Sequence, residues 1–350
     1  MKKIRFGITG SGYMARTHAE AIKWLGETAS LSAVFGGTRA PDFAKRYGIA
    51  LEPSVQSLVK RDDIDAIVVT TPHHLHITEV MAALEAGKHV LIEKPMATSV
   101  ADCDRMLAAA AARKLTIGVG YNLRFRDLPL KTRELVRSGA IGKIVNMHLT
   151  FFVDVELFNN QNFGGVNKMT WIKMPENIGF VIDGLPHGVD LMRWLTGAEV
   201  KSVAGFSRTF IPGRQVEDTT AGIMEFTSGA ICTVNTSCAV PGPYPGQYSH
   251  YSIIGTEGLI DLDPMSELHI STRKDGWKLV ATQPKVGWES ADTAFGDARM
   301  KAYREQMQSF IDGIHGKPMA TGSGQDGRDG LAACLGMLTS TREHRLVDLA

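Results

Sequence analysis

The sequence predicts an α/β protein with two parts: a doubly wound parallel sheet, followed by an α+β domain with a large, open and mainly antiparallel sheet. A length of 350 residues is enough for about two domains. In the first third, short apolar runs alternate with segments of helical periodicity, which is typical of a parallel sheet. From about residue 122 onward, short strand patterns follow one another, which is typical of an antiparallel sheet.

The elements of the first part follow from apolar runs bounded by turn residues. Runs that stop at Gly or at Thr-Pro predict buried strands, and the segments between them have the 3.6-residue period of a helix. In chain order, we expect strand 4–8, helix 14–25, strand 31–35, helix 42–47, strand 64–70, helix 77–85, strand 89–92, helix 100–113 and strand 116–119.

The second part begins where this rhythm changes, so the domains are expected at residues 1–122 and 123–350. An open antiparallel sheet has a bare face unless another subunit covers it, so the second domain is expected to form a homo-oligomer, a dimer or a tetramer. Its expected elements are helix 130–138, strand 144–152, helix 189–195, strands 200–210, 219–226, 230–237, 249–254 and 267–271, and helices 304–315 and 330–343.

The composition excludes several classes of protein. Lys and Arg number 38 against 37 Asp and Glu, a net charge of +1, which argues against nucleic acid as a partner. No apolar run approaches the ~20 residues that a membrane helix needs, so no membrane partner is expected. The 4 cysteines are scattered without a CxxC pair, which favours a reduced, cytoplasmic chain without a disulfide framework or a zinc site.

The segment Gly10–Ala15 (Gly-Ser-Gly-Tyr-Met-Ala) joins the first strand to the first helix. It matches G-x-G-x-x-G/A, in which one glycine makes the tight turn, the second admits a pyrophosphate, and a small last residue lets helix and strand pack closely. The helix N-terminus supplies N–H donors and the positive end of its dipole. The loop predicts a Rossmann domain that binds a dinucleotide through Gly10, Ser11, Gly12, Tyr13 and Met14.

The end of the second strand indicates which dinucleotide is bound. A carboxylate that binds the ribose 2′-hydroxyl of NAD is usual there, whereas this chain has Gly36-Gly37-Thr38-Arg39. A hydroxyl beside a guanidinium suits the 2′-phosphate of NADP, so we favour NADP over NAD, with Thr38 and Arg39 as contacts. The alternative is that Arg39 is a solvated loop charge.

Further motifs extend along the chain. They are Thr71-Pro72-His73-His74-Leu75-His76, Gly87–Pro95 with its final Glu-Lys-Pro, Asp183-Gly184-x-x-His187-x-x-Asp190 with Trp194 and Gly197, Gly255-Thr256-Glu257-Gly258, and Asp326-Gly327. Together with the glycine loop, these motifs resemble the Gfo/Idh/MocA family of pyridine-nucleotide oxidoreductases over nearly the whole chain. One departure is His73, which stands where that family usually has asparagine.

The resemblance implies a dehydrogenase that exchanges a hydride between NAD(P) and a CH–OH group. It places Glu93 near the nicotinamide ribose and Lys94 toward the substrate, at the carboxyl edge of the sheet where ligands bind in such folds. It assigns catalysis to Lys94, Asp183 and His187, which also bind the substrate. Other implied coenzyme contacts are Thr71, Pro72, His73, His76, Glu93, Lys94 and Asn122.

Asp183 and His187 are four residues apart, which puts them on one face if a helix has begun there, and Pro186 is consistent with a helix start nearby. A histidine can take the hydroxyl proton as the hydride leaves, and a carboxylate can orient it or accept a substrate hydroxyl. His187 is our first choice as general base, and Lys94 the second. Read alone, the pair also fits a helix cap and a surface histidine, and Asp190 fits a structural role.

The remaining polar residues support weaker expectations. Histidines at 18, 73, 74 and 76 invite a metal interpretation, but no carboxylate or thiolate stands at ligand spacing, so we expect loop histidines beside a coenzyme pocket and no metal. Arg124 either binds the substrate or pairs with a carboxylate between the two domains. Trp171 and Lys173, in the polar loop 159–174, are expected to shape a pocket for a polyhydroxylated substrate.

The sequence thus favours a dehydrogenase of a sugar, glycoside, polyol or cyclitol. One alternative substrate is a non-sugar diol such as an aromatic cis-dihydrodiol, because Phe151, Phe152, Phe158 and Phe163 lie near the expected pocket in the sequence. Another is suggested by similar proteins that oxidise and re-reduce one carbon to permit elimination, and so act as NAD-dependent glycosidases or lyases. A non-catalytic dinucleotide sensor is disfavoured, because it needs no Lys94, Asp183 and His187.

Overall fold

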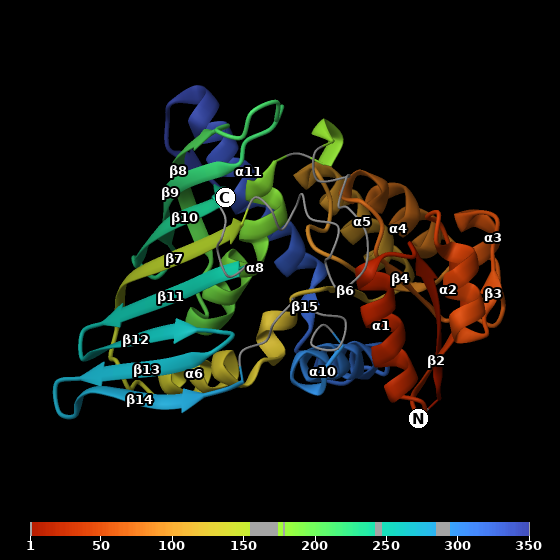
Figure 1. The fold of residues 1–350 in the computed structure, drawn as a ribbon, viewed down its shortest axis with the longest axis horizontal. Coiled ribbons are helices and arrows are strands. Elements are labelled where there is room, and N and C mark those ends of the chain that lie inside the picture. The colour runs from red at the N-terminus through yellow and green to blue at the C-terminus, as the bar shows by residue number, and fades with distance from the viewer. Residues whose placement is uncertain (1, 155–173, 178, 242–246, 285–294, 350) are drawn as a thin grey trace. The chain divides into compact units, whose positions relative to one another are not determined.

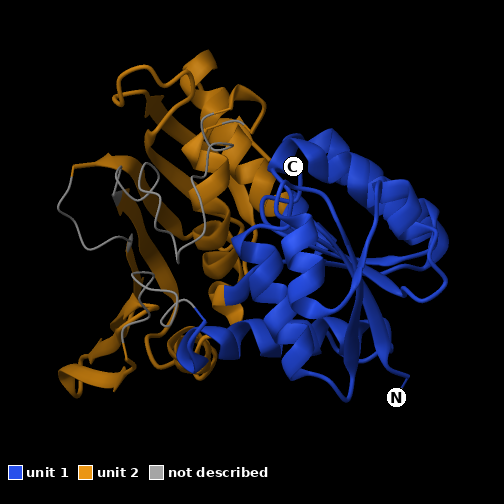
Figure 2. Cartoon of the chain, turned by 45° about the vertical axis from the view of Figure 1, so that its right-hand side comes forward, with its two compact units in different colours: residues 1–122, 295–328 blue, residues 123–294, 329–350 orange. Residues whose placement is uncertain are grey.

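The computed structural model of the chain describes residues 2–154, 174–177, 179–241, 247–284 and 295–349 (Figure 1). The chain divides into two compact units (Figure 2). The first unit contains residues 1–122 and 295–328, and the second contains residues 123–294 and 329–350. The first unit ends at Asn122 and resumes at residue 295, so residues 295–328, which were expected in the second domain, pack with the first unit.

The first unit is built on a seven-stranded sheet in which every strand pair is parallel except β15 with β6. The sheet has the order β15-β6-β5-β4-β1-β2-β3. Its strands are β1 (Ile4–Thr9), β2 (Ala29–Phe35), β3 (Ala50–Leu51), β4 (Ala66–Val69), β5 (His89–Ile92), β6 (Ile117–Val119) and β15 (Gly322–Ser323).

Helices cover both faces of this sheet, so its middle strand, β4, is apolar and buried throughout. Phe6 and Ile8 point into a core shared with the helices α1 and α10, whereas a side chain at Gly7 would meet Leu58 of α3 on the opposite face. The helices of this unit are α1 (Tyr13–Trp24), α2 (Ala40–Tyr47), α3 (Val55–Val59), η1 (His73–Leu75), α4 (His76–Glu85), α5 (Val100–Arg113) and α10 (Asp297–Ile314); η2 (Asn122–Phe125) follows at the division between the units.

Residues 295–328 belong to the first unit because their apolar side chains fill its core. Met307 and Phe310 of α10 are fully buried there, and a side chain at Gly118 of β6 would lie 2.8 Å from the Phe310 ring. β15 then extends the sheet by pairing with β6. Helix α10 begins at Asp297, one and a half to two turns before the helix expected from residue 304.

The second unit is built on a nine-stranded sheet in which only the pair β10–β7 is parallel (Figure 1). The sheet has the order β14-β13-β12-β11-β7-β10-β9-β8-β16. Its strands are β7 (Ile144–Asp154), β8 (Val200–Arg208), β9 (Thr219–Phe226), β10 (Ile231–Val240), β11 (Gln247–Gly255), β12 (Gly258–Asp263), β13 (Glu267–Thr272), β14 (Gly276–Thr282) and β16 (Val347–Asp348). The fold class is therefore the expected one.

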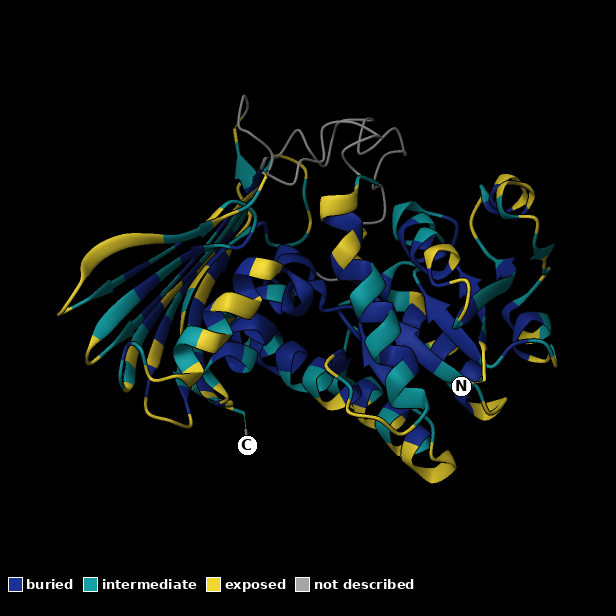
Figure 3. Ribbon diagram, turned by 90° about the horizontal axis from the view of Figure 1, so that it is seen from below, coloured by how far each residue is buried: buried dark blue, intermediate teal, exposed yellow. Residues whose placement is uncertain are grey.

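The helices of the second unit lie on one face of its sheet (Figure 3). Helix α8 begins at Phe180. We had expected a helix start near Pro186, but this proline lies inside the helix. Proline has no N–H to donate, so the bond to the Ile182 carbonyl is missing from this turn. None of the described helices has the length and apolar character to cross a membrane. The helices are α6 (Asp127–Arg137), η4 (Pro175–Asn177), α8 (Phe180–Thr196) and α11 (Gly324–Glu343), which starts in the first unit.

Candidate functional site

The glycine loop of the first unit has the geometry of an anion site. Gly10 has φ +90° and a Cβ there would lie 2.7 Å from Thr70 Oγ1, so only glycine fits. Gly12 is the N-cap of α1 and contributes no side-chain hydrogen bond to the helix N-terminus. The nearest atom to a Cβ at Gly12 is Nη2 of Arg39, 3.7 Å away. The loop therefore leaves N–H donors and room for a pyrophosphate.

The turn after β2 lies against this loop. Gly37 has φ +82°, and a Cβ there would lie 2.5 Å from Ser11 Oγ. Arg39 follows, half-buried, and burial lowers its pKa. No described carboxylate forms an ion pair with Arg39. The turn thus presents a cation and no acid to the glycine loop, which suits an additional phosphate on the ribose.

His76 links the ends of β4 and β5. Its Nε2 lies 2.8 Å from the carbonyl oxygen of Thr71, and its Nδ1 lies 3.0 Å from that of Pro95. The ring is fully buried, and burial lowers the pKa of His76. In its neutral form the imidazole donates to only one of these two carbonyl oxygens. His76 therefore lies between the Thr-Pro turn and the Glu-Lys-Pro turn, whose Lys94–Pro95 bond is cis.

Two buried carboxylates stand near these turns. Glu79 accepts hydrogen bonds from the hydroxyls of Thr9 and Thr71 at 2.6 and 2.7 Å, and burial raises its pKa. Glu93 lies 2.7 Å from Nε2 of His18, which is buried on α1. His18 was expected to be a loop histidine beside the pocket; the structure places it under the Glu-Lys-Pro turn.

The contacts of His18 extend to a second expected coenzyme residue. Tyr303 of α10 packs edge-on against His18, with ring centroids 6.1 Å apart, and its hydroxyl accepts a hydrogen bond of 2.6 Å from Asn122 Nδ2. Glu93 and Asn122 are thus held through His18 and Tyr303. Tyr303 could not be identified from the sequence, because it lies 181 residues beyond Asn122.

In the second unit, Asp183 and His187 lie one turn apart on α8, Asp183 buried and His187 half-buried. The helix lies close to β7, because side chains at Gly184 and Gly188 would approach Phe151 and Leu149 within 2.6 and 2.5 Å. Since both glycines face the sheet, Asp183 and His187 are turned about 100° away from it. Glu217, which the sequence did not mark, accepts a hydrogen bond from the N–H of Val181 in the first turn.

Arg124 forms a buried ion pair with Asp190. Its Nε donates to Oδ2 at 2.8 Å and its Nη2 to Oδ1 at 2.5 Å, and the side chains are 7% and 1% exposed. Both residues belong to the second unit. The ion pair expected for Arg124 was one between the domains, whereas the carboxylate that it contacts, Asp190, lies in the same unit.

The expected catalytic residues are divided between the units. Lys94, half-buried, follows β5 in the first, whereas Asp183 and His187 belong to the second. Trp171 and Lys173 lie outside the described residues. Among those described, no group of three or more His, Cys, Asp or Glu could hold a metal ion.

The class of protein follows from these features together with two matches to family models. Residues 4–121 match an oxidoreductase family with an NAD-binding Rossmann fold, and residues 130–261 match the GFO/IDH/MocA C-terminal domain. The chain is therefore an oxidoreductase with an NAD(P)-binding domain. It belongs to the Gfo/Idh/MocA family, whose two models together match more than half of it.

Relatives of this chain act on sugars and cyclitols. It is similar to 1,5-anhydro-D-fructose reductase of Ensifer adhaerens, 28% identical with 95% of each chain covered. It is 29% identical to 2,7-anhydro-N-acetylneuraminate hydratase of Escherichia coli, over 78% of this chain and 71% of the other. A solved levoglucosan dehydrogenase, in complex with NADH and levoglucosan, has a TM-score of 0.84 at 22% identity, covering 99% of this chain and 100% of that one, and thus the same fold.

Proposed function

We propose that this chain is an NAD(P)-dependent dehydrogenase that exchanges a hydride between the coenzyme and a secondary alcohol or ketone of a sugar, glycoside, polyol or cyclitol. The observation that carries the proposal is the pair Asp183 and His187, one turn apart on a helix that glycines hold against the sheet. Distant relatives that are dehydrogenases of sugars and cyclitols support the substrate class.

The proposed residues divide the chemistry of alcohol oxidation. His187 takes the hydroxyl proton, the C–H electron pair leaves with its hydrogen as hydride, and the remaining oxygen electrons form the C=O bond. Lys94 donates a hydrogen bond to that oxygen and stabilises its alkoxide character. Asp183 orients His187 or accepts a neighbouring substrate hydroxyl. The bound nicotinamide supplies the hydride acceptor, and the reverse reaction uses the same groups.

The glycine loop fits the coenzyme. Its N–H donors and the open space at Gly12 would hold the pyrophosphate, and Glu93, His73 and Asn122 would lie toward the nicotinamide end. At the other end, Thr38 and Arg39 would bind a 2′-phosphate, so NADP is the proposed coenzyme. No acid in the described turn competes for Arg39, which supports this preference.

The reaction is tested by the absorbance of reduced nicotinamide. Purified protein is mixed with NAD or NADP and with sugars, glycosides, inositols and aryl diols in turn. The proposal expects turnover with a polyhydroxylated compound, whereas turnover with aryl diols alone would move the substrate to non-sugar diols. Lys94→Ala and His187→Asn should bind coenzyme but lose turnover, and the exposed-residue controls Lys131→Ala and His344→Asn should not. Wild-type rates in the first two variants would refute the assigned site.

The coenzyme preference is tested at Arg39. Arg39→Ala should lower kcat/KM for NADP by roughly 10- to 100-fold, because a charge-assisted bond to the phosphate is lost, and should change kcat/KM for NAD little. Lys45 lies on α2, the helix that directly follows Arg39, so Lys45→Ala serves as a control for general loss of charge. An equal loss for both coenzymes would contradict the assignment.

A second candidate function is a hydratase or lyase that uses the nicotinamide only transiently. The similarity to 2,7-anhydro-N-acetylneuraminate hydratase is the observation that favours it. Such an enzyme keeps its coenzyme through purification and accumulates no reduced nicotinamide. Product formation from an anhydro-sugar or glycoside without a change in absorbance would therefore identify this function.

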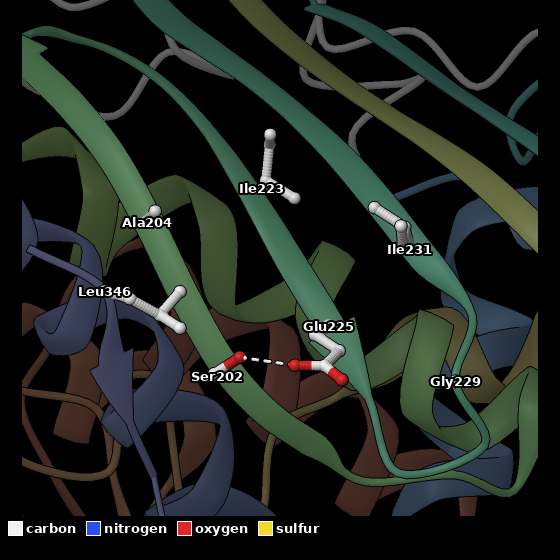
Figure 4. A pocket seen from close by; sticks show the side chains of 7 residues that line it. All are labelled: Ser202, Ala204, Ile223, Glu225, Gly229, Ile231 and Leu346. Carbon is white, nitrogen blue, oxygen red and sulfur yellow. Dashed lines mark hydrogen bonds between the residues drawn. The ribbon is translucent and has the colours of Figure 1, made fainter.

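The proposal includes a homo-oligomer formed through the open face of the nine-stranded sheet. A row of residues, each paired with the next on the neighbouring strand, crosses this face. Exposed apolar side chains, Ile223 and Leu279, lie near the two ends of the row. A shallow hollow lined by Ile223, Ile231 and Leu346 lies beside β8, β9 and β10 (Figure 4). The row is Ala204, Ile223, Thr233, His148, Ser252, Asp261, His269 and Leu279.

Molar mass measured by light scattering tests the oligomer. The wild type should be a dimer or tetramer, and Ile231→Asp should lower its mass, since a buried charge opposes association. Leu51→Asp, which changes an equally exposed residue of the first unit, should not: the two side chains are 46% and 48% exposed. A monomeric wild type would contradict the proposal. A reducing, cytoplasmic location, also proposed, is supported by four buried free thiols.

A further inference from the structure

Helix α8 is held at its N-terminus by one residue of another segment. Glu217 lies just before β9, and its main-chain oxygen accepts the N–H of Phe180 at 3.1 Å. Its side-chain Oε1 accepts the N–H of Val181 at 2.6 Å. The first N–H groups of a helix have no partner within the helix, so these two bonds attach α8 to the sheet.

The attachment lies beside a turn of α8 that lacks one main-chain hydrogen bond. Pro186 cannot donate to the carbonyl of Ile182, so the turn that contains Asp183 lacks one main-chain bond. The N-cap residue, Gly179, contributes no side-chain bond. The bonds to Glu217 therefore stabilise the helix start where its own bonding is incomplete.

Gly179 leaves room for the side chain of Glu217. Its φ of −72° and ψ of −160° are open to any residue, so glycine is not needed for backbone conformation. A Cβ at this position would instead overlap the Glu217 carboxylate. Glycine at residue 179 thus leaves empty the space that the Glu217 carboxylate occupies.

We propose that Glu217 is a positioning residue of this enzyme, which fixes the first turn of α8 and thereby the place of Asp183 and His187. The assignment of those two residues to the reaction rests on the proposed function. Glu217 itself acts through the helix, because its bonds are to main-chain N–H groups of α8.

The attachment changes with pH near neutrality. Burial raises the pKa of Glu217 to about 7, although the Val181 N–H and the charge of Arg214 act in the opposite direction. The ionised carboxylate is the stronger acceptor and also favours the positive end of the helix dipole. Burial outweighs both of these effects, so the buried group binds its proton more tightly than a solvated one, and the attachment weakens as pH rises from about 4.5 to about 7. The titratable groups that face Glu217 or its neighbour Cys238 are Asp183, Arg214, Asp218, Cys238 and Cys334.

A double-mutant cycle at residues 179 and 217 tests the geometry without requiring any activity. Gly179→Ala should lower the unfolding midpoint and speed amide exchange of peptide 179–185 in the wild-type background. The same change should have little effect in Glu217→Ala, because the space is then empty. Equal effects in both backgrounds would overturn the attachment.

Kinetics test the positioning role. Glu217→Ala should lower kcat by about 10- to 100-fold with the coenzyme KM unchanged, as expected when reacting groups are misplaced. Glu217→Gln still accepts the Val181 N–H but does not titrate, so it should retain most of the kcat and lose the part of the pH dependence near pH 7. Wild-type kcat in a folded Glu217→Ala, or an unaltered pH profile in Glu217→Gln, would refute the role.

The two proposals can fail separately. Glu225→Gln, which changes a half-buried carboxylate on β9, is the control for loss of a carboxylate. If His187→Asn leaves turnover unchanged, the proposed site is wrong, and with it the positioning role of Glu217. The cycle at residue 179 still decides whether Glu217 holds α8. If His187→Asn abolishes turnover while Glu217→Ala does not lower it, only the positioning role is wrong.

Discussion

Two buried carboxylates, one in each unit, have different kinds of partner. In the first unit, Glu79 accepts hydrogen bonds from two threonine hydroxyls. In the second, Asp190 forms an ion pair with the guanidinium of Arg124. Removing a neutral partner leaves one hydrogen bond unmade, whereas removing a charged partner leaves a buried charge. The comparison predicts that the Asp190 site is more sensitive than the Glu79 site to the loss of one partner.

The largest expected effect is at Arg124. Arg124→Met removes the partner of Asp190, which is 1% exposed, and should lower the free energy of unfolding by about 3–5 kcal/mol in urea denaturation. Adding Asp190→Leu should restore much of the loss, because no buried charge remains. If the double variant is no more stable than Arg124→Met, the unpaired charge is not the cause.

A smaller effect is expected for the matching change in the first unit. Thr9→Val preserves shape but removes one of the two hydroxyls that Glu79 accepts from, and should cost about 1–2 kcal/mol by the same denaturation measurement. Ser32→Ala is the control, because it removes a half-buried hydroxyl that donates to the main-chain carbonyl of Asp63 and does not contact Glu79. If Thr9→Val lowers the free energy of unfolding as much as Arg124→Met does, neutral and charged partners do not differ in the way proposed.

The smallest effect should be on the pH dependence of overall stability, because the units respond in opposite directions. The lowered pKa of His76 means that the unfolded chain binds a proton first, so stability is lost as pH falls below about 6.5. The raised pKa of Glu217 means that the folded chain binds the proton, so stability is lost as pH rises from about 4.5 to about 7.

Unfolding midpoints of two non-titrating variants separate these contributions. Relative to the wild type, His76→Gln should lose less stability toward acid, and Glu217→Gln should gain stability at pH 8 but not near pH 4.5. Amide exchange of peptides from each unit assigns the change to a unit. Parallel shifts of both variants would show that the groups do not titrate in opposite senses.

The first unit could be predicted from sequence in greater detail than the second. Its strands are buried on both faces and bounded by turn residues, and the strand 89–92 and the helix 100–113 lie where the pattern places them. The glycine loop is a local motif. In the second unit, the β12 and β14 strands were not anticipated, because half of each faces outward and their apolar runs are short.

The supports of the candidate site could not be predicted, because they join distant segments. His18 and Glu93 are 75 residues apart in the sequence, and Val181 and Glu217 are 36 apart. Asp183 and His187 could be named from their spacing and the family resemblance. Their helix, however, starts at Phe180, earlier than Pro186 indicated. Glu217 stabilises this start by accepting a hydrogen bond from the N–H of Val181.

The place of residues 295–328 has a consequence for synthesis on the ribosome. The first unit needs Met307 and Phe310 to complete its core, yet these residues follow almost the whole second unit in the chain. At ribosomal rates, roughly 10–40 s separate the emergence of residue 122 from that of residue 328. During this interval the surface of β1 and α1 that α10 covers faces water. A chain truncated before residue 295 would therefore be an incomplete coenzyme domain with exposed apolar surface, and a substrate for chaperones or proteases.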